Sequence, residues 1–486
     1  MVSQKRPNII FIHTDSMDGR AMGCMGHPAL SRSTPNLDCL AREGVLFRNA
    51  YSNNPICCPS RSSMWSGLYT HHCEGWNNHK GLSESDPTFL NHLVRTGYSS
   101  KILGKTDYLS GYHTERAKVS AWTRSANIMS PNYRIGPPCV LDDYRPRVSQ
   151  GDWHNIDEAA AWLRRKKTSD APFFLYLGIH APHPPFVTSR YYLDMIDESR
   201  VVLPPLDENK HPVLAYQRCN KNWLHGFSDE NIRLVRRIYF AMIAEVDAML
   251  GELLKTVRET GQAGSTHVIF SSDHGELALE HRQFFKMSPY EPSVRVPLII
   301  RGPGIRPNVT AETLVALVDI YPTLMDMAQL PHPGGLDGHS LMPELMGRPT
   351  EHPGWVLAEC HDSSCRTGIF MLRQENWKYI AYVGCEPQLF NLADDPWEIN
   401  NLAEKNPAKT RALDVLLRQI VDYEAVDRKV KAYDQASFRQ WREEHKTAGD
   451  YNELMARIFS GWDGLAAGEG KPWTAADERQ IESWLG

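Results

Sequence analysis

Two adjacent cysteines followed by a proline, a serine and an arginine form the first stretch of this chain that could perform chemistry. The run from Asn53 to Arg61 reads NNPICCPSR. Neighbouring cysteines rarely bond to each other, because disulfide geometry requires a Cα separation that adjacent residues reach only with strain. A zinc knuckle would require a second pair of ligands nearby, and none follows closely. Taken alone, the stretch is compatible with a buried thiol pair at the start of a helix.

Acidic and imidazole side chains follow three runs that read as buried strands. Because ligands of parallel sheets bind at the carboxyl ends of the strands, these side chains are expected to gather in one site. The positions are Asp15 after NIIFIHT (8–14), His183 in the loop after FFLYLGI (173–179), and Asp273 with His274 after HVIFS (267–271).

Strands alternate with helical patterns over about 340 residues, which is typical of an α/β fold with a doubly wound, mostly parallel sheet. The longest helical pattern, Glu230 to Thr260, places its apolar residues on one stripe. Shorter helices are predicted for 35–43 and 317–327, and a further strand for 296–300.

The pattern changes after Pro353. The run FMLRQENWKYIAY predicts an antiparallel hairpin, and residues 409–423 predict a helix. We therefore expect a large domain over 1–352 and a smaller α+β subdomain over 353–486. The last fifty residues, rich in tryptophan and charge, show no sharp pattern.

Composition limits the partners and the compartment. The 53 basic and 58 acidic residues give a net charge of −5, which offers no electrostatic case for nucleic acid or an anionic membrane as a partner. No apolar run approaches the ~18 residues that a membrane span needs. The 10 cysteines are scattered and match no compact disulfide framework, and the first strand follows the N-terminus too closely for a signal peptide. We therefore expect a cytoplasmic protein.

Together, and in this order, the motifs resemble those of the type I sulfatases of the alkaline-phosphatase-like superfamily, over nearly the whole chain. Cys57 to Arg61 matches the family's C-x-P-S-R maturation signal, and only Cys57, not Cys58, stands in its register. The resemblance implies that a formylglycine-generating enzyme oxidises Cys57 to Cα-formylglycine, whose hydrate is the nucleophile. It also implies an alkaline-phosphatase-like fold, with 1–352 as the catalytic domain.

A hydrated aldehyde suits the hydrolysis of a sulfate ester. The sulfur is surrounded by negative oxygens, so attack requires a strong nucleophile and neutralised charge. One hydroxyl of a geminal diol can attack, and the other can then expel sulfate by re-forming the aldehyde, whereas a serine would stay trapped as its sulfate ester. Arg61, one helical turn after Cys57, would fix the formylglycine and balance local negative charge. The alternative for Arg61 is a surface arginine.

The resemblance also implies one divalent metal. Ca²⁺ is the expected ion, with Mn²⁺ and Mg²⁺ as alternatives. Many sulfatases have a second aspartate where this chain has Ser16, and an asparagine where it has His274. In both respects the chain is similar to the phosphonate monoester hydrolases and choline sulfatases of the same superfamily. Asp18 is a possible substitute ligand, with a solvated turn aspartate as the alternative. The implied ligand set is Asp15, Cys57 as formylglycine, Asp273 and His274.

Cationic groups complete the site that the resemblance implies. Lys105 in LGKTDY and Lys286 in FFKMSPYE match the family's two sulfate-binding lysines, and the compact charge of a lysine suits a sulfate oxygen. His183 matches the histidine near the bridging oxygen, where it could bind substrate and protonate the departing alkoxide. Asp107 stands where many sulfatases have a histidine, so either Asp107 or His113 could be the base that releases sulfate.

Longer matches, among them GWNNHKGL and SSDHGELALEHRQFFKMSPYE, resemble the arylsulfatase K branch, the glucuronate-2-sulfatases of glycosaminoglycan breakdown. They favour a carbohydrate sulfate, such as a uronate 2-O-sulfate, or an aryl sulfate as substrate, with Asn78 as a further substrate-binding candidate and a turn role as its alternative. A uronate carboxylate would need a cation of its own. The unassigned basic groups near the motifs are His79, Lys80, His113, His281 and Arg282.

Two other functions are compatible with the same motifs. One is hydrolysis of phosphonate or phosphate mono- and diesters by the same diol. The other is a non-catalytic, anion-binding protein in which Cys57 stays a thiol. The expected partners are a sulfated small molecule or saccharide and the formylglycine-generating enzyme, and a homo-oligomer is also allowed.

Overall fold

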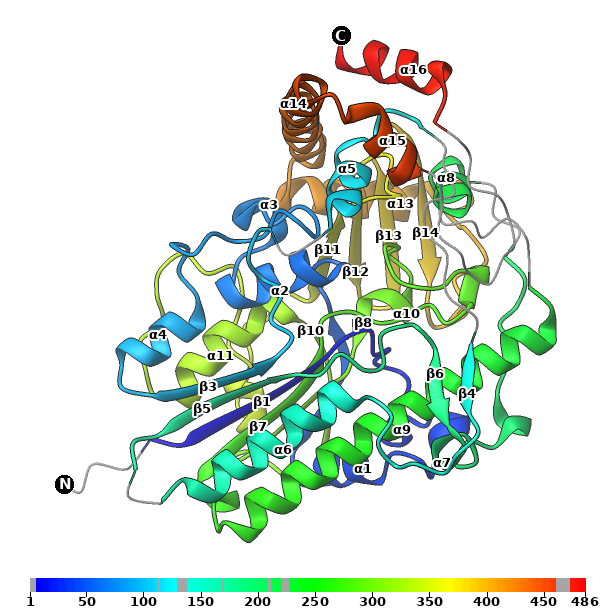
Figure 1. Ribbon diagram of the computed structural model, residues 1–486. Helices are drawn as coiled ribbons and strands as arrows, with labels where there is room; N and C mark the ends of the chain where they lie inside the picture. Colours follow the sequence, from blue (N-terminus) through cyan, green and yellow to red (C-terminus); the bar gives the residue numbers. More distant parts are fainter. Residues whose placement is uncertain are drawn as a thin grey trace.

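The chain folds around a central eight-stranded mixed sheet with helices on both faces, and a smaller antiparallel sheet lies beside it (Figure 1). This computed structural model describes residues 6–111, 114–128, 138–167, 170–207, 211–220, 227–459 and 473–486, with only the backbone at 219 and 220.

The strands of the central sheet are β1 Asn8–Thr14, β2 Val45–Tyr51, β3 Ser99–Gly104, β5 Phe173–Gly178, β7 Thr266–Ser272, β8 Arg295–Val296, β9 Leu298–Arg301 and β10 Val309–Ala316. They run in the order β10-β2-β9-β7-β1-β5-β3, with β8 paired to β2. β1 pairs in parallel with β5 and β7, as do β3 with β5 and β10 with β2. The short β8 and β9 are antiparallel to their neighbours.

The single strand predicted for 296–300 is divided at Pro297. Proline has no backbone N–H to give to a ladder, so it is confined to strand ends and edges. β8 and β9 on its two sides each pair with β2, and β9 also pairs with β7.

Alternation along β1 explains the two layers of helices. Successive side chains of a strand point to opposite faces, so an unbroken apolar strand needs both faces covered. Ile10 and Ile12 belong to the core of one layer, and Ile9 and Phe11 to the core of the other. The first layer contains α1 Pro35–Arg42, α6 Gln150–Arg165 and α9 Asp229–Glu259, and the second contains α2 Cys57–Ser66, α4 Phe89–Arg95 and α11 Ile320–Met327.

A four-stranded antiparallel sheet carries the C-terminal subdomain, in the order β11-β12-β13-β14. One face packs on the central domain, and α13 covers the other. At the interface the fully buried Lys378 lies 2.8 Å from Glu291 and 2.7 Å from Glu398. The bounds are β11 Trp355–Cys360, β12 Ile369–Gln374, β13 Trp377–Tyr382, β14 Cys385–Asn391 and α13 Pro407–Ile420.

The predicted fold class, a doubly wound and mostly parallel α/β sheet with a smaller antiparallel subdomain, is confirmed. The predicted hairpin corresponds to β12 and β13. The predicted helix 409–423 begins two residues earlier, at Pro407, and ends at Ile420. The division of the chain between 352 and 353 stays a prediction.

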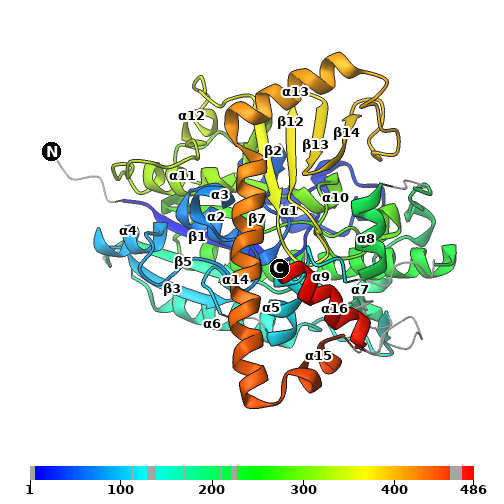
Figure 2. The ribbon, with the colours of Figure 1, turned by 90° about the horizontal axis from the view of Figure 1, so that it is seen from above.

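The end of the chain is helical, although its sequence showed no sharp pattern. In Figure 2, α14 runs from the second sheet towards α5 and α15. Its buried face carries charged residues as well as apolar ones, among them Asp434, which pairs with Arg124 at 2.8 Å. Charges on a buried face weaken the apolar periodicity that identifies a helix. The bounds are α5 Glu115–Trp122, α14 Tyr423–Ala448, α15 Tyr451–Phe459 and α16 Ala475–Leu485.

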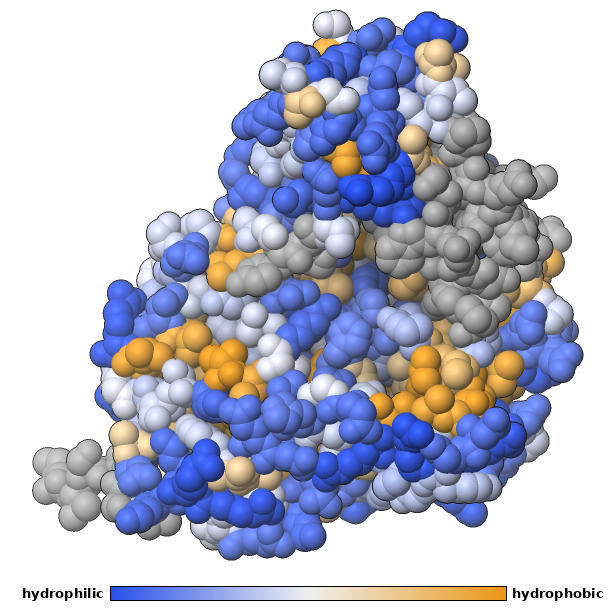
Figure 3. Space-filling view, viewed as in Figure 1, coloured by the Kyte–Doolittle hydropathy of each residue, from blue (hydrophilic) through white to orange (hydrophobic). Residues whose placement is uncertain are grey.

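Shorter elements are α3 Thr70–Cys73, β4 Cys139–Leu141, β6 Val187–Ser189, α7 Arg190–Leu193, α8 Pro212–Asn220, α10 Glu291–Val294 and α12 Met342–Leu345. The face seen in Figure 1 is largely hydrophilic, with apolar side chains in separate groups (Figure 3). Within the described ranges, no helix combines the length and the apolar composition needed to cross a bilayer.

Candidate active site

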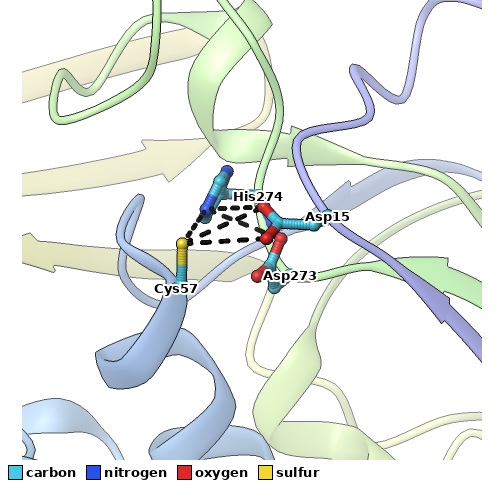
Figure 4. A group of neighbouring side chains, drawn as sticks. All are labelled: Asp15, Cys57, Asp273 and His274. Atoms are coloured by element: carbon cyan, nitrogen blue, oxygen red, sulfur yellow. Dashed lines mark hydrogen bonds and ion pairs between the residues drawn. The ribbon is translucent and has the colours of Figure 1, made fainter. Parts of the chain in front are cut away.

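Four side chains meet at the carboxyl ends of β1 and β7 (Figure 4). Asp15 follows β1, Asp273 and His274 follow β7, and Cys57 is the first residue of α2. Their ligand atoms all lie within 4.8 Å of one another, and all four residues are buried. The structure therefore brings together the whole ligand set that the motifs implied.

The His274 ring is held in the tautomer that a metal ligand needs. Its Nδ1 lies 2.9 Å from the carbonyl oxygen of Gly275 and donates to it, which leaves a lone pair on Nε2. This Nε2 lies 3.2 Å from Cys57 Sγ, 3.6 Å from Asp15 Oδ1 and 3.5 Å from Asp273 Oδ1. Burial lowers the pKa of His274 to about 4, so the ring is neutral at physiological pH. Two carboxylates and a neutral imidazole, all buried, fit a divalent cation.

The two adjacent cysteines face different surroundings. Cys57 Sγ lies 3.9 and 4.0 Å from the carboxylate oxygens of Asp15. Cys58 Sγ lies 3.8 Å from the hydroxyl of Ser62 and 3.9 Å from the carbonyl oxygen of Leu109. Burial raises the pKa of the Cys57 thiol to about 11 and raises that of Cys58 further. Only Cys57 contacts the carboxylate and imidazole cluster.

Arg61 is fully buried, so the alternative of a surface arginine is wrong. Residues four apart on a helix share a side, which brings Arg61 to the same side of α2 as Cys57. Its Nε lies 2.8 Å from Asp273 Oδ2. Its Nη1 donates to the carbonyl oxygen of Lys105 at 3.0 Å and to the hydroxyl of Tyr176 at 2.9 Å. The guanidinium thus orients a candidate metal ligand and the backbone of a candidate sulfate ligand.

Two lysines and a histidine stand beside the cluster. Lys105 Nζ contacts a carboxylate oxygen of Asp15. Lys286 Nζ lies 2.9 Å from His183 Nε2, and His183 Nδ1 lies 2.6 Å from the carbonyl oxygen of Pro184. The ring therefore donates from Nδ1 and accepts a lysine proton at Nε2. Burial and the charge of Lys286 hold the pKa of His183 well below its usual range.

The buried charges of the site stabilise one another. Burial by itself would raise the pKa of the Asp15 carboxyl, but the positive charges of Lys105 and Lys286 hold it well below its usual range. Burial by itself would lower the pKa of Lys286, but the Cys57 thiol and the Asp15 carboxylate raise it. The Lys105 side chain is 16% exposed, so part of it is accessible from solvent. An anion that enters the site therefore meets its positive charge.

Asp107, the predicted base, lies in the same loop as Lys105. Gly178, the last residue of β5, packs directly against this loop. A Cβ atom at Gly178 would lie 1.9 Å from the carbonyl oxygen of Lys105, so only glycine fits there. Asp107 Oδ2 lies 3.2 Å from Lys105 Nζ. His113, the alternative base, lies outside the described residues.

Asn78 holds the start of α2. Its side-chain oxygen accepts the backbone N–H of Cys58 at 3.1 Å, and its own N–H donates to Asp362 Oδ2 at 3.0 Å. Asp18, the alternative metal ligand, lies outside the cluster and pairs with Arg20 at 2.7 Å. Asp18 is therefore not part of the cluster, and because it is buried it is not a solvated turn aspartate either.

The basic groups considered for a second anion have separate surroundings. His281 is buried, lies 2.8 Å from Asp207 and stacks on Tyr290. Arg282 donates to the carbonyl oxygen of Pro204, and His79 is buried. Lys80 is half-buried in the turn that also contains Asn78.

Sequence reasoning missed two residues that hold the site in place. The hydroxyl of Tyr176 lies 2.9 Å from His13 Nδ1 and accepts from Arg61. A tyrosine inside an apolar strand is the available signal, because a buried phenol usually finds a polar partner. Asp362, which accepts from Asn78, follows β11 in the second sheet, and no local pattern connects it to α2.

Comparisons with known proteins agree with this geometry. The sulfatase family model matches residues 7–330, and a model for the N-sulphoglucosamine sulphohydrolase C-terminal region matches 279–425. Arylsulfatase K of Bos taurus is 40% identical over 511 residues, which cover 99% of this chain and 92% of that protein. Arylsulfatase K of Homo sapiens is 39% identical over 482 residues, 93% and 89% of the two chains. The phosphonate monoester hydrolase of Agrobacterium radiobacter has a TM-score of 0.71 at 25% identity and covers 85% of this chain and 95% of its own.

The expectation of a cytoplasmic protein was wrong. The arylsulfatase K relatives are sulfatases of the secretory and lysosomal pathway. The expectation rested on scattered cysteines and on the short distance from the first residue to the first strand. Neither the spacing of the cysteines nor the position of the first strand determines the compartment in which a protein works.

The ligand set predicts how metal content responds to substitution. Asp15→Asn and Asp273→Asn should each lower the divalent metal retained after dialysis and the turnover rate together, because each variant loses a charged oxygen ligand. Elemental analysis of folded protein, with folding checked by circular dichroism, gives the metal content per chain. Asp18→Asn is the matched control and should keep its metal. Full metal occupancy in both ligand variants would refute the ligand set.

Proposed function

The chain belongs to the sulfatase family and is a sulfuric ester hydrolase, and within that activity we propose that it removes the 2-O-sulfate of a uronic acid, or a close carbohydrate sulfate. We also propose that Cys57 is the residue matured to Cα-formylglycine. The observation that carries the proposal is the position of Cys57, which is in register with the maturation signal and contacts a buried cluster that two lysines flank.

We propose where this chain would hold the two groups that the sulfatase family generally uses, a divalent metal and a formylglycine. Asp15, Asp273, His274 and the side chain at position 57 would hold the divalent metal. We propose Ca²⁺, because carboxylates dominate the set, with Mn²⁺ and Mg²⁺ as alternatives. When bound, the ion supplies positive charge beside the nucleophile and the sulfate. Formylglycine, made by a formylglycine-generating enzyme, supplies a hydroxyl of its hydrate as the nucleophile.

The side chains around the cluster bind the anion and move protons. Lys105 and Lys286 bind the peripheral sulfate oxygens and neutralise their charge. Asn78, whose side-chain oxygen holds the start of α2, also donates its amide NH2 to a sugar oxygen. When Lys286 binds sulfate, His183 Nε2, which contacts Lys286 Nζ in this structure, holds the proton that is transferred to the departing alkoxide oxygen. Asp107, beside Lys105, accepts a proton from the group at position 57 when sulfate is released.

Phosphonate or phosphate ester hydrolysis is the second candidate function. The similarity to a phosphonate monoester hydrolase favours it, as do Ser16 and His274 at the two positions where many sulfatases differ. The ratio of kcat/KM on matched aryl sulfate and aryl phosphonate esters distinguishes the two. The homo-oligomer stays a prediction.

The two neighbouring cysteines should behave differently when replaced. Cys57→Ala should abolish turnover, because it removes the residue that is matured. Cys58→Ala should keep most of the turnover, because its thiol faces Ser62 and Leu109. Rates on an aryl sulfate, together with the intact mass of each variant, test this. Equal loss of activity in two folded variants would contradict the assignment.

His183 should matter most for substrates with poor leaving groups. Proton donation contributes about 10²–10⁴-fold where the departing oxygen carries much charge. His183→Ala should therefore slow hydrolysis of a sugar sulfate far more than that of a nitrophenyl sulfate. The measurement is the slope of log kcat against leaving-group pKa for wild type and variant. An equal loss across all leaving groups would mean that His183 only positions the sulfate.

A uronate carboxylate should be recognised by its charge. We propose Lys80 as its partner, because Lys80 is half-buried in the turn that holds Asn78. Lys80→Met should lower kcat/KM for 2-O-sulfated glucuronate by about tenfold or more, since a hydrogen bond to a charged group contributes ~1.5–3 kcal/mol. The substitution should leave kcat/KM for an uncharged 2-O-sulfated glucoside and for an aryl sulfate unchanged.

Lys101→Met is the control for this experiment, because Lys101 pairs with Glu158 on the surface. If the wild-type enzyme shows no preference for the uronate over the glucoside, the uronate proposal fails and the sulfatase activity remains. If Lys80→Met lowers kcat/KM for all three substrates equally, Lys80 does not recognise the carboxylate.

A further inference from the structure

Two buried thiols lie almost in contact at one end of the second sheet. Cys360 is the last residue of β11, and Cys365 follows it after a four-residue loop, 361–364. Their Sγ atoms are 3.1 Å apart, and the two residues are 1% and 0% exposed. This separation is shorter than the contact distance of unbonded sulfur atoms. Only a small shift would therefore bring them to the ~2.05 Å of a disulfide bond.

The loop between these cysteines contacts the turn of Asn78 on one side. Asp362 Oδ2 accepts the N–H of Asn78 at 3.0 Å, and the side-chain oxygen of Asn78 accepts the N–H of Cys58 at 3.1 Å. A continuous chain of hydrogen bonds thus leads from the loop to the first turn of α2, where Cys57 lies.

The other side of the loop contacts the segment that contains Lys286. Cys365 Sγ lies 3.6 Å from the carbonyl oxygen of Met287, the residue after Lys286, and 3.6 Å from Gln217 Nε2. Arg124 Nη1 donates to the carbonyl oxygen of Cys365 at 2.8 Å. The loop therefore lies between the turn of Asn78 and the segment that contains Lys286.

We propose that Cys360 and Cys365 form an intrachain disulfide that holds this loop, and through it the turn of Asn78, in the conformation seen here. The oxidant is a small-molecule or protein disulfide. The thiolate of one cysteine attacks that disulfide, breaks its S–S bond and releases one half of the oxidant as a thiol, which leaves a mixed disulfide. The second cysteine then displaces the other half of the oxidant as a thiol. Two electrons and two protons pass from the cysteine pair to the oxidant. The inference goes beyond the proposed function and does not depend on it.

Burial decides when the bond forms and how long it lasts. Exchange requires a thiolate that the oxidant can reach, and both cysteines are enclosed in the folded chain. The bond therefore forms before this loop closes against Met287, or during a local opening. Once the fold is complete, the same enclosure shields it from soluble reductants.

Thiol trapping tests the bond directly. Protein held in oxidised glutathione, with mild denaturant to open the loop, is returned to buffer, unfolded in alkylating agent and digested. We expect the peptide with both cysteines to lack two hydrogen atoms and to resist alkylation until it is reduced. Cys385, half-buried in the same sheet, is the internal control and should be alkylated. Alkylation of Cys360 and Cys365 to the same extent as Cys385 would overturn the proposal.

A double-mutant cycle separates a bond from two independent thiols. Oxidised Cys360→Ser, Cys365→Ser and the double variant should show the same drop in Tm, because any one of them removes the whole bond. They should also show the same rise in KM, since the loop positions the turn of Asn78. Additive losses would overturn the proposal. Cys385→Ser should leave both quantities unchanged, and treating wild-type protein with reductant in mild denaturant should reproduce the loss.

Discussion

The buried ion pair between Arg61 and Asp273 is the constraint on which the rest of the site depends. Neither side chain has exposed surface, and Nε lies 2.8 Å from Oδ2. Charges removed from water are tolerated only when they are paired and hydrogen-bonded, and the loss of one partner typically costs about 3–5 kcal/mol. The guanidinium also donates to the carbonyl oxygens of Lys105 and Thr14. A single side chain therefore connects the helix that carries Cys57 to β7, to β1 and to the loop after β3.

Charges of both signs are buried together in the site, and this lets one small volume bind a cation and an anion. Lys105 contacts the carboxylate of Asp15, so a group suited to sulfate oxygens touches a group suited to a metal. Each charge offsets the desolvation of the other, as the lowered pKa of Asp15 and the raised pKa of Lys286 show. In such an environment electrostatic interactions are stronger than in water. The arrangement of opposite charges that suits the site to a cation and an anion therefore also stabilises its buried side chains.

The second sheet contributes to the site as well as to the core. Asp362 reaches Asn78, which holds the start of α2, and the buried Lys378 lies between Glu291 and Glu398 where the sheet meets the central domain. The helices that follow α13 were not apparent in the sequence, since α14 buries Asp434 against Arg124 and so loses a clean apolar stripe. Local periodicity identifies a helix whose buried face is apolar. It does not identify a helix whose buried face carries charged residues that pair with residues far away in the sequence.

The sequence by itself determined the strands β1, β5 and β7 and the residue types of the candidate site. β1 has the predicted bounds, because an uninterrupted apolar run ending in an aspartate has few other structures available to it. The register of Cys57 and the metal-ligand types could also be stated from local motifs. Only the tertiary structure decided which partners these residues have: the contact of His183 with Lys286, the burial of Arg61 against Asp273, and the use of Asn78 to hold α2. Each of these contacts joins segments far apart in the chain, and the way in which the sheet and helices pack sets their distances, which no local pattern records.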